Sequence, residues 1–368
     1  MNKYNKYPMR KKFLIAAALL LCGLALWGDK KPVLIKDKTP THIEKNLVPL
    51  KLVHIIKSEF DKEHFLARPR ELAIDSKNNL YVYDDLLNQV LIFDARFKFI
   101  KAIGQTGEGP GDFSPSRTPK SIGIWEDNLL VWDHLRRRII IFNPEGRCVS
   151  ETKFPEYLRD VYPLILGDFH HRKFIAISTR TQSLGIYDKD YQHSGDLLKY
   201  EDYQIFFLRI PRMEDNKIIG NEPDTSNTWV QTLSGNRIVV YQSNSSTVYI
   251  FQDYKLKKRF DVRPALKIEY YKEAIQRLKK KLNKENFLKA IFNGFFVDQD
   301  NEKYIYFNGS SSMEKDEKLI FYRFDLEGKL VCMLYYYNAN AVAFMVKRGG
   351  LFYAVDNYNE QIFIFKEK

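Results

Sequence analysis

A repeated spacing between pairs of apolar segments constrains the fold of this chain more than any other feature. Each pair consists of two short segments rich in β-branched and aromatic residues, separated by a short polar turn. Such segments are typical of β-strands, so each pair predicts a β-hairpin. Matching apolar positions are ten residues apart in five pairs: Tyr83 and Phe93, Trp132 and Phe142, Ile177 and Tyr187, Tyr241 and Phe251, and Val355 and Phe365.

These hairpins belong to larger units of four strands. A sixth pair, at residues 304–307 and 320–325, is stretched by a polar loop, and a further short strand precedes and follows most pairs. Six four-stranded units of about 40 to 50 residues predict an all-β, six-bladed β-propeller of antiparallel blades over residues 47–368. The last unit has three strands of its own, and we expect the isolated N-terminal strand at residues 50–56 to close it. A β-sandwich is the alternative that many short strands also permit.

Two of the predicted blades share a short motif at the turn between their second and third strands. Its residues are Asp133, Arg138, Ile139 and Phe142, and Asp356, Asn359, Ile362 and Phe365. They resemble the D-x-x-N-x-R-I-x-x-F run of NHL-type repeats, and residues 104–113 look like the glycine-rich link between NHL blades. Ser178, Gln242 and Asn308 replace the aspartate of the motif in blades three to five. The chain thus resembles the exported bacterial six-bladed propellers related to the NHL group, and this resemblance implies the fold while leaving the function open.

Residues 265–290 interrupt the strand pattern between blades 4 and 5. Apolar residues at helical spacing, with lysines around them, predict one helical insertion there. The apolar stripe of this helix could pack on the rim of the propeller, or the helix could contact an anionic membrane or an acidic partner. The apolar residues are Tyr271, Ile275, Leu278 and Leu282.

The first 28 residues have the pattern of an export segment. Several Lys and Arg precede an apolar stretch at residues 13–27, which is shorter than the roughly 20 residues that span a bilayer. We expect residues 1–28 to be a signal peptide or membrane anchor and residues 29–46 to be a linker. Soluble export, an uncleaved anchor and a lipid on Cys22 remain alternatives. Each places the propeller in the periplasm or at the cell surface, and we expect membrane contact through the N-terminus.

The net charge of +12 does not indicate a nucleic-acid partner. The excess of Lys and Arg lies in residues 1–50 and 265–290, and the rest of the chain is balanced. The sequence therefore does not support a basic groove along the propeller. Cys148 and Cys332 are the cysteines that follow the export segment, and two distant cysteines do not form a disulfide framework.

Acidic residues give the chain its one candidate for a metal site. Asp84, Asp133 and Asp356 each end the second strand of a blade, and such acids around a channel could hold Ca²⁺. We favour the alternative that each carboxylate accepts hydrogen bonds from its own turn, as in an Asx-turn. No H-x-x-x-H or C-x-x-C spacing predicts zinc, so we expect no cofactor.

Two functions fit this pattern. The first is a non-catalytic binding or scaffold module for a protein, peptide or glycan, and the second is a metal-assisted, lactonase-like hydrolase or lyase at the central channel. The second needs matching ligands on the innermost strands, but Glu71, Asp75 and Asp298 do not occur at equivalent positions along the repeat. We therefore favour the binding module, and we expect a monomer.

The side of the propeller that carries the links between blades is the predicted binding face. The longest irregular or inserted stretches, at residues 104–119, 203–228 and 264–293, fall in these links, and long loops on a rigid scaffold are the usual place for binding residues. We expect Arg138 to make hydrogen bonds within the repeat. The predicted binding residues are His134, Arg136, Arg180, Trp229 and Tyr358.

Overall fold

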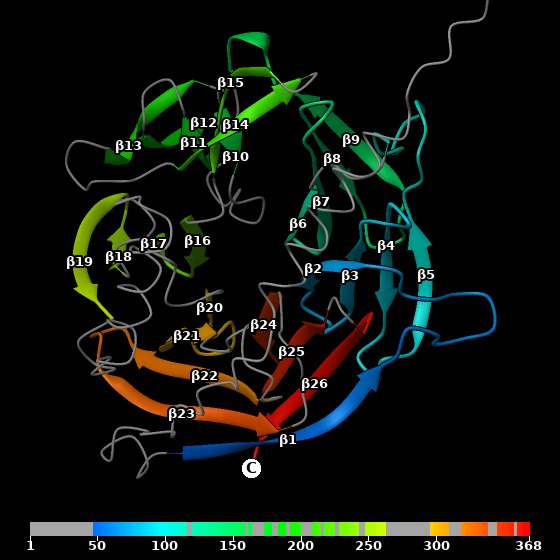
Figure 1. Ribbon diagram of the computed structural model, residues 1–368, viewed down its shortest axis with the longest axis vertical. Coiled ribbons are helices and arrows are strands. Elements are labelled where there is room, and N and C mark those ends of the chain that lie inside the picture. Colours follow the sequence, from blue (N-terminus) through cyan, green and yellow to red (C-terminus); the bar gives the residue numbers. More distant parts are fainter. Residues whose placement is uncertain are drawn as a thin grey trace, which may run out of the picture. The chain divides into compact units, whose positions relative to one another are not determined.

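The described part of the chain consists of short strands with apolar residues on both faces (Figure 1). The computed structural model describes residues 47–115, 120–158, 161–163, 173–178, 183–188, 192–199, 208–214, 217–224, 228–242, 247–262, 295–308, 318–337, 344–356 and 359–368. The predicted export segment, the linker and the 265–290 insertion lie outside these ranges. Within them, the helical structure is a 3-10 turn at Glu156–Leu158, so the inserted helix has no support. No helix of the described part is long and apolar enough to cross a membrane.

The strands form six groups of four, each paired antiparallel, and this confirms an all-β propeller architecture. We number these groups as blades 1 to 6 along the chain. Their strands, from the innermost to the outermost, are β2 (Pro69–Ile74), β3 (Leu80–Asp84), β4 (Gln89–Phe93) and β5 (Phe99–Ile103) in blade 1; β6 (Lys120–Trp125), β7 (Asn128–Asp133), β8 (Arg138–Phe142) and β9 (Cys148–Lys153) in blade 2; β10 (Val161–Pro163), β11 (Lys173–Ser178), β12 (Ser183–Asp188) and β13 (His193–Lys199) in blade 3; β16 (Thr228–Leu233), β17 (Arg237–Gln242), β18 (Thr247–Gln252) and β19 (Lys255–Asp261) in blade 4; β20 (Phe295–Val297), β21 (Tyr304–Asn308), β22 (Lys318–Asp325) and β23 (Leu330–Tyr337) in blade 5; and β24 (Phe344–Arg348), β25 (Leu351–Asp356), β26 (Gln361–Glu367) and β1 (Leu47–Ile56) in blade 6.

The N-terminal strand closes the last blade, as predicted. β1 pairs antiparallel with β26, from Leu50 opposite Glu367 to Ile56 opposite Ile362. Its first residues, from Leu47 to Pro49, also pair parallel with β23 of blade 5, a contact that the sequence did not predict. β1 therefore covers the edges of two blades, which would otherwise expose unpaired backbone groups.

Buried side chains join each blade to the next and close the circle. One cluster lies between blades 1 and 2, and others follow between each successive pair up to blades 5 and 6. A further cluster joins blade 6 to blade 1 through β1, β25 and β26. The large aromatic side chains that are almost fully buried include Trp132, Tyr83 and Tyr241, so the aromatic residues of the repeat form the packing between blades.

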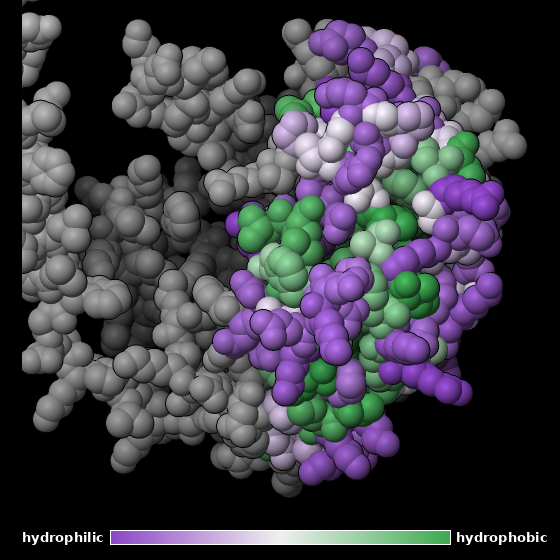
Figure 2. All heavy atoms as spheres, turned by 90° about the vertical axis from the view of Figure 1, so that its right-hand side faces the viewer, coloured by the Kyte–Doolittle hydropathy of each residue, from purple (hydrophilic) through white to green (hydrophobic). Residues whose placement is uncertain are grey.

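The outer side of two blades and one additional hairpin complete the fold. The side of blades 1 and 2 shows small hydrophobic patches separated by hydrophilic residues (Figure 2), as expected where outermost strands such as β9 face solvent. β14 (Leu208–Glu214) and β15 (Lys217–Asp224) form a separate hairpin between blades 3 and 4. The sequence predicted an irregular stretch there.

Candidate functional site

Hydrogen bonds bring the inter-blade links and the turns between second and third strands onto one face, which we call the link face. In blade 1, the carboxylate of Asp84 at the end of β3 accepts hydrogen bonds from the backbone N–H groups of Ala67 and Arg68 in the preceding link, at 2.7 and 2.8 Å. In the turn after β3, Asn88 Nδ2 donates to the Ser114 carbonyl oxygen in the next link, at 2.9 Å. Links and turns therefore form one connected surface, as the sequence predicted.

The loop at residues 104–114, which joins blades 1 and 2, has a fixed backbone. Gly107 N donates to the Phe113 carbonyl at 3.2 Å, and Phe113 N donates to the Gln105 carbonyl at 2.7 Å. The Phe113 ring is buried between the two blades. It lies where a Cβ on Gly104 would be, and Gly104 has a φ of +79°, so this position requires glycine. The glycines here serve turn geometry and ring packing.

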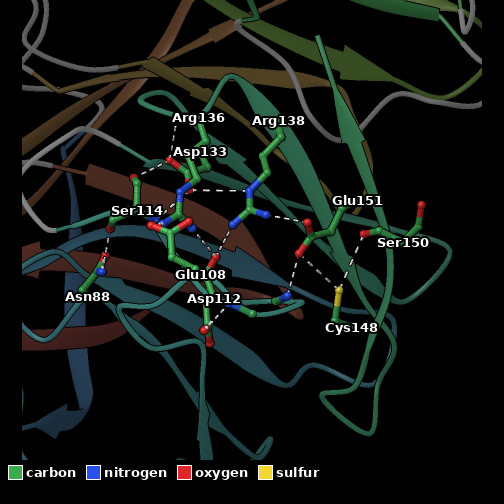
Figure 3. Close-up of polar contacts among 12 residues, drawn as sticks. Asn88, Glu108, Asp112, Ser114, Asp133, Arg136, Arg138, Cys148, Ser150 and Glu151 are labelled. Carbon is green, nitrogen blue, oxygen red and sulfur yellow. Dashed lines mark hydrogen bonds and ion pairs between the residues drawn. The ribbon is translucent and has the colours of Figure 1, made fainter.

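Two arginines of blade 2 hold this loop (Figure 3). Arg138 lies at the start of β8 and is nearly buried, with its guanidinium donating to the Asp112 carbonyl and the Glu151 carboxylate. Arg138 thus bonds within its own blade through Glu151, as expected, and also holds the link through Asp112. Arg136, in the turn before β8, donates to the Asp112 carbonyl at 3.4 Å and to Glu108 Oε1 at 2.5 Å. Glu108 projects into solvent with 89% of its side chain exposed.

The three aspartates at the ends of second strands are fully buried turn residues. Asp133 accepts a hydrogen bond from Arg136 N in its own turn, at 3.5 Å, and two more from the backbone N–H and the hydroxyl of Ser114 in the link, at 2.8 and 2.5 Å. Asp84 accepts from two N–H groups of its own turn, and Asp356 accepts from Asn359 N and Nδ2. The interpretation as turn carboxylates is confirmed. The described residues contain no group of three or more His, Cys, Asp or Glu that could hold a metal ion.

The predicted binding residues divide into three groups. His134 and Arg136 lie together in the turn between β7 and β8 on the link face, where the His134 ring contacts the Trp132 ring at 5.5 Å. Trp229 is the second residue of β16, and its ring stacks on Tyr241 at 5.7 Å and packs against the cluster between blades 4 and 5. The remaining predictions, Arg180, Tyr358 and Cys22, lie outside the described residues.

A charged group at the start of the innermost strand of blade 1 was missed by sequence reasoning. Arg68 lies just before β2 and Arg70 lies within it, and both donate through Nε to the carboxylate of Asp85 in the turn after β3. The Arg70–Asp85 distance is 3.0 Å. These residues fall outside the repeated motif, so only the pairing of strands reveals that they meet.

A second missed feature concerns the acids of the innermost strands. Glu71 of β2 accepts a hydrogen bond at 2.9 Å from Ile122 N in β6, the innermost strand of the next blade. Burial raises the pKa of Glu71 to about 7. Asp75 and Asp298 each follow the last residue of an innermost strand, and each accepts from a tyrosine hydroxyl, that of Tyr81 or Tyr306. The prediction that these acids are not at equivalent positions is therefore wrong for Asp75 and Asp298.

The blades and their closure define a six-bladed β-propeller. The chain belongs to the DUF5128 family of 6-bladed beta-propellers, whose model matches residues 53–308. No curated protein matches the chain. The narrower resemblance to NHL-type repeats stays a prediction.

One solved structure supports the fold, and two others show a weaker likeness. A member of the DUF4221 family from Bacteroides vulgatus shares 13% identity and a TM-score of 0.57, and the match covers 88% of this chain and 98% of that one. A protein of unknown function from Bacteroides thetaiotaomicron shares 10% identity and a TM-score of 0.49, covering 85% and 73%. Virginiamycin B lyase from Staphylococcus aureus shares 9% identity and a TM-score of 0.47, covering 86% and 99%. The similarity to the DUF4221 protein supports the fold alone. The other two similarities are too weak to support a conclusion.

Proposed function

We propose that this protein is a non-catalytic binding module that captures a protein, peptide or glycan through its link face. The observation that carries the proposal is the 104–114 loop, which presents exposed residues such as Glu108 yet is fixed because Ser114 donates to Asp133 and because Arg136 and Arg138 donate to the Asp112 carbonyl. A loop that is already ordered loses little conformational entropy when a ligand binds. The buried carboxylates at the ends of the second strands, which could have held a metal ion, accept hydrogen bonds within the links and turns instead.

The ion pair between Arg136 and Glu108 lies on the link face, and a ligand could take the place of Glu108 in it. Glu108 is almost fully exposed, and an ion pair with one solvated partner contributes little to stability. A carboxylate of the ligand could therefore replace Glu108 as the partner of Arg136 at small cost.

The test compares capture by link-face variants with capture by a matched variant on the other face. Arg136→Glu and Leu135→Asp alter the link face, whereas Arg96→Glu alters an exposed arginine in the turn between β4 and β5. We expect both link-face variants to lose capture in pull-downs and on glycan arrays while remaining folded, and we expect Leu135→Asp, at an exposed position, to leave the melting temperature unchanged. Loss of capture with Arg96→Glu instead would contradict the proposal. Cleavage of the captured molecule would favour the hydrolase or lyase alternative.

We also propose that the propeller acts outside the cytoplasm, attached through its N-terminal segment. The support is the apolar stretch that follows a basic start. Cell fractionation and mass spectrometry of the mature N-terminus test this. A lipid on Cys22 predicts that Cys22→Ala releases the protein from membranes, while unprocessed protein in the cytoplasm would contradict export.

A further inference from the structure

Two arginines share one carboxylate at the channel side of the link face. Arg68 Nε donates to one oxygen of Asp85 and Arg70 Nε donates to the other. The side chains of Arg68 and Arg70 are 33% and 48% exposed, whereas that of Asp85 is 12% exposed. The group therefore carries one uncompensated positive charge, and its exposed part is the arginine pair.

Both arginines use Nε for this contact. Among the described residues, the hydrogen bonds of these two side chains are those that Nε donates to Asp85, and their terminal guanidinium nitrogens donate none. Guanidinium groups bind carboxylates best through two parallel N–H groups, and each arginine still has its terminal nitrogens for such contacts. Asp85 thus holds the two side chains in place without using up their donors.

The backbone directs Arg70 to this place. The register between β2 and β3 shifts between Pro69 and Glu71, so Arg70 lies at a bulge opposite no residue of β3. Bulges often turn a side chain toward a functional site. In a strand without this shift, the Arg70 side chain would point to the face of the sheet opposite to that of Pro69 and Glu71.

Exposed leucines lie in the same turns. Leu86 follows Asp85 and is 50% exposed, and Leu135, at the same position of the turn in blade 2, is 58% exposed. Blades 1 and 2 are neighbours with a shared core. An exposed apolar residue at the same position of two adjacent blades, beside arginines, indicates contact with a partner that has both acidic and apolar groups.

We propose that the link face of blades 1 and 2 binds an acidic peptide segment whose carboxylates pair with Arg68 and Arg70 and whose aliphatic side chains cover Leu86 and Leu135. This inference rests on the proposed function and names its ligand class. Leucines offer contacts to aliphatic side chains rather than the flat surface on which a sugar ring stacks, so the observations favour a peptide over an acidic glycan.

The test measures binding of labelled peptides to the full-length chain in detergent by fluorescence anisotropy. The probes are a peptide of alternating glutamate and leucine, its lysine–leucine and glutamate–serine counterparts, and a polygalacturonate oligomer. We expect the glutamate–leucine peptide to bind best. Arg68→Gln with Arg70→Gln should weaken it at least about tenfold, and Leu86→Ser should weaken it several-fold.

Matched controls lie on other surfaces of blade 1. Arg96→Gln and Ile100→Ser change an exposed arginine and an exposed apolar residue, and we expect neither to alter binding. Arg70→Gln alone keeps Arg68 on Asp85, so it serves as the second variant if the double variant melts early.

Three results would overturn the inference. They are no binding of the glutamate–leucine peptide, equal loss with Arg96→Gln, or binding of polygalacturonate in its place with the same arginine dependence. The last result would leave the proposed function intact and replace the ligand class. Capture that is insensitive to Arg136→Glu and Leu135→Asp would instead remove the proposed function itself.

Discussion

At the scale of single residues, Glu71 and Gln231 form the same kind of contact with different chemistry. Each lies on an innermost strand and accepts a hydrogen bond from a backbone N–H of the next blade, Ile122 N for Glu71 and Val297 N for Gln231, at 2.9 and 2.8 Å. Gln231 shows that an amide oxygen suffices. The carboxyl of Glu71 therefore makes the stability of the fold depend on pH, although the hydrogen bond between the blades does not require an acid.

Replacing Glu71 with glutamine should remove this dependence. Because burial raises the pKa of Glu71 from 4.5 to about 7, the folded state holds the proton more tightly than the unfolded state. The stability from this group is complete below about pH 4.5 and is lost as the pH rises through about 7. We expect Glu71→Gln to stabilise the protein by about 2 kcal/mol near pH 8 and to have little effect near pH 5, measured by denaturant unfolding.

Gln231→Glu is the matched control, since it places a carboxyl in the second bridge. We expect it to destabilise the protein at alkaline pH. An unchanged pH profile for Glu71→Gln would show that Glu71 does not titrate in this range.

The residue scale also shows why the sequence hid some equivalences. Asp75 pairs across the turn with Asn79, whereas Asp298 pairs with Tyr304, so the two turns differ in length. A fixed spacing cannot align positions on opposite sides of turns of unequal length. Strand register, which depends on tertiary packing, is needed to show that the two acids correspond.

At the scale of elements, one buried aspartate connects the 104–114 loop to blade 2. Asp133→Ala removes the buried acceptor of two Ser114 hydrogen bonds. We expect a loss of about 1 to 3 kcal/mol in the free energy of unfolding. The amides of Gly107 and Phe113, which bond within the loop, should exchange hydrogen faster. Asp356→Ala, in blade 6, should leave their exchange unchanged, and equal acceleration by both variants would refute a local role for Asp133.

β1 closes the propeller, so its removal should be more damaging than that of any flanking segment. Deleting residues 47–58 exposes the edges of β26 and β23, which β1 pairs, and we expect aggregation in size-exclusion chromatography. Deleting residues 35–46 removes none of these pairs and is the control. A β1-deleted chain that stays monomeric and melts like the parent would contradict the closure.

The elements that repeat were predictable, and those that depart from the repeat were not. The ten-residue spacing indicates hairpins because buried apolar residues, such as Tyr83 and Phe93, occur at the same positions in the blades that share it. The hairpin of β14 and β15 carries Pro211 and Pro223 and has no such spacing. The bulge at Arg70 also breaks the alternation along β2. The sequence therefore predicted that links and turns share a face and that Arg136 lies there, but it did not predict the arginine pair on Asp85.

At the scale of the whole propeller, the two faces differ in how their charged side chains are used. Opposite the link face, turns between first and second strands bond to one another between blades, as when Ser76 N donates to Asp127 at 2.9 Å and Ser234 N to Glu302 at 2.6 Å. These carboxylates hold neighbouring blades together. On the link face, arginines and leucines remain exposed.

Site-specific photo-crosslinking in the producing cell tests most directly whether the link face binds the ligand. A photoreactive amino acid at Leu135 reports the link face, and one at Ile100 reports the rim of blade 1; both side chains are about half exposed. We predict a discrete crosslinked adduct from position 135 that disappears with Arg68→Gln and Arg70→Gln, and none from position 100. An adduct from position 100 with none from position 135 would contradict the account.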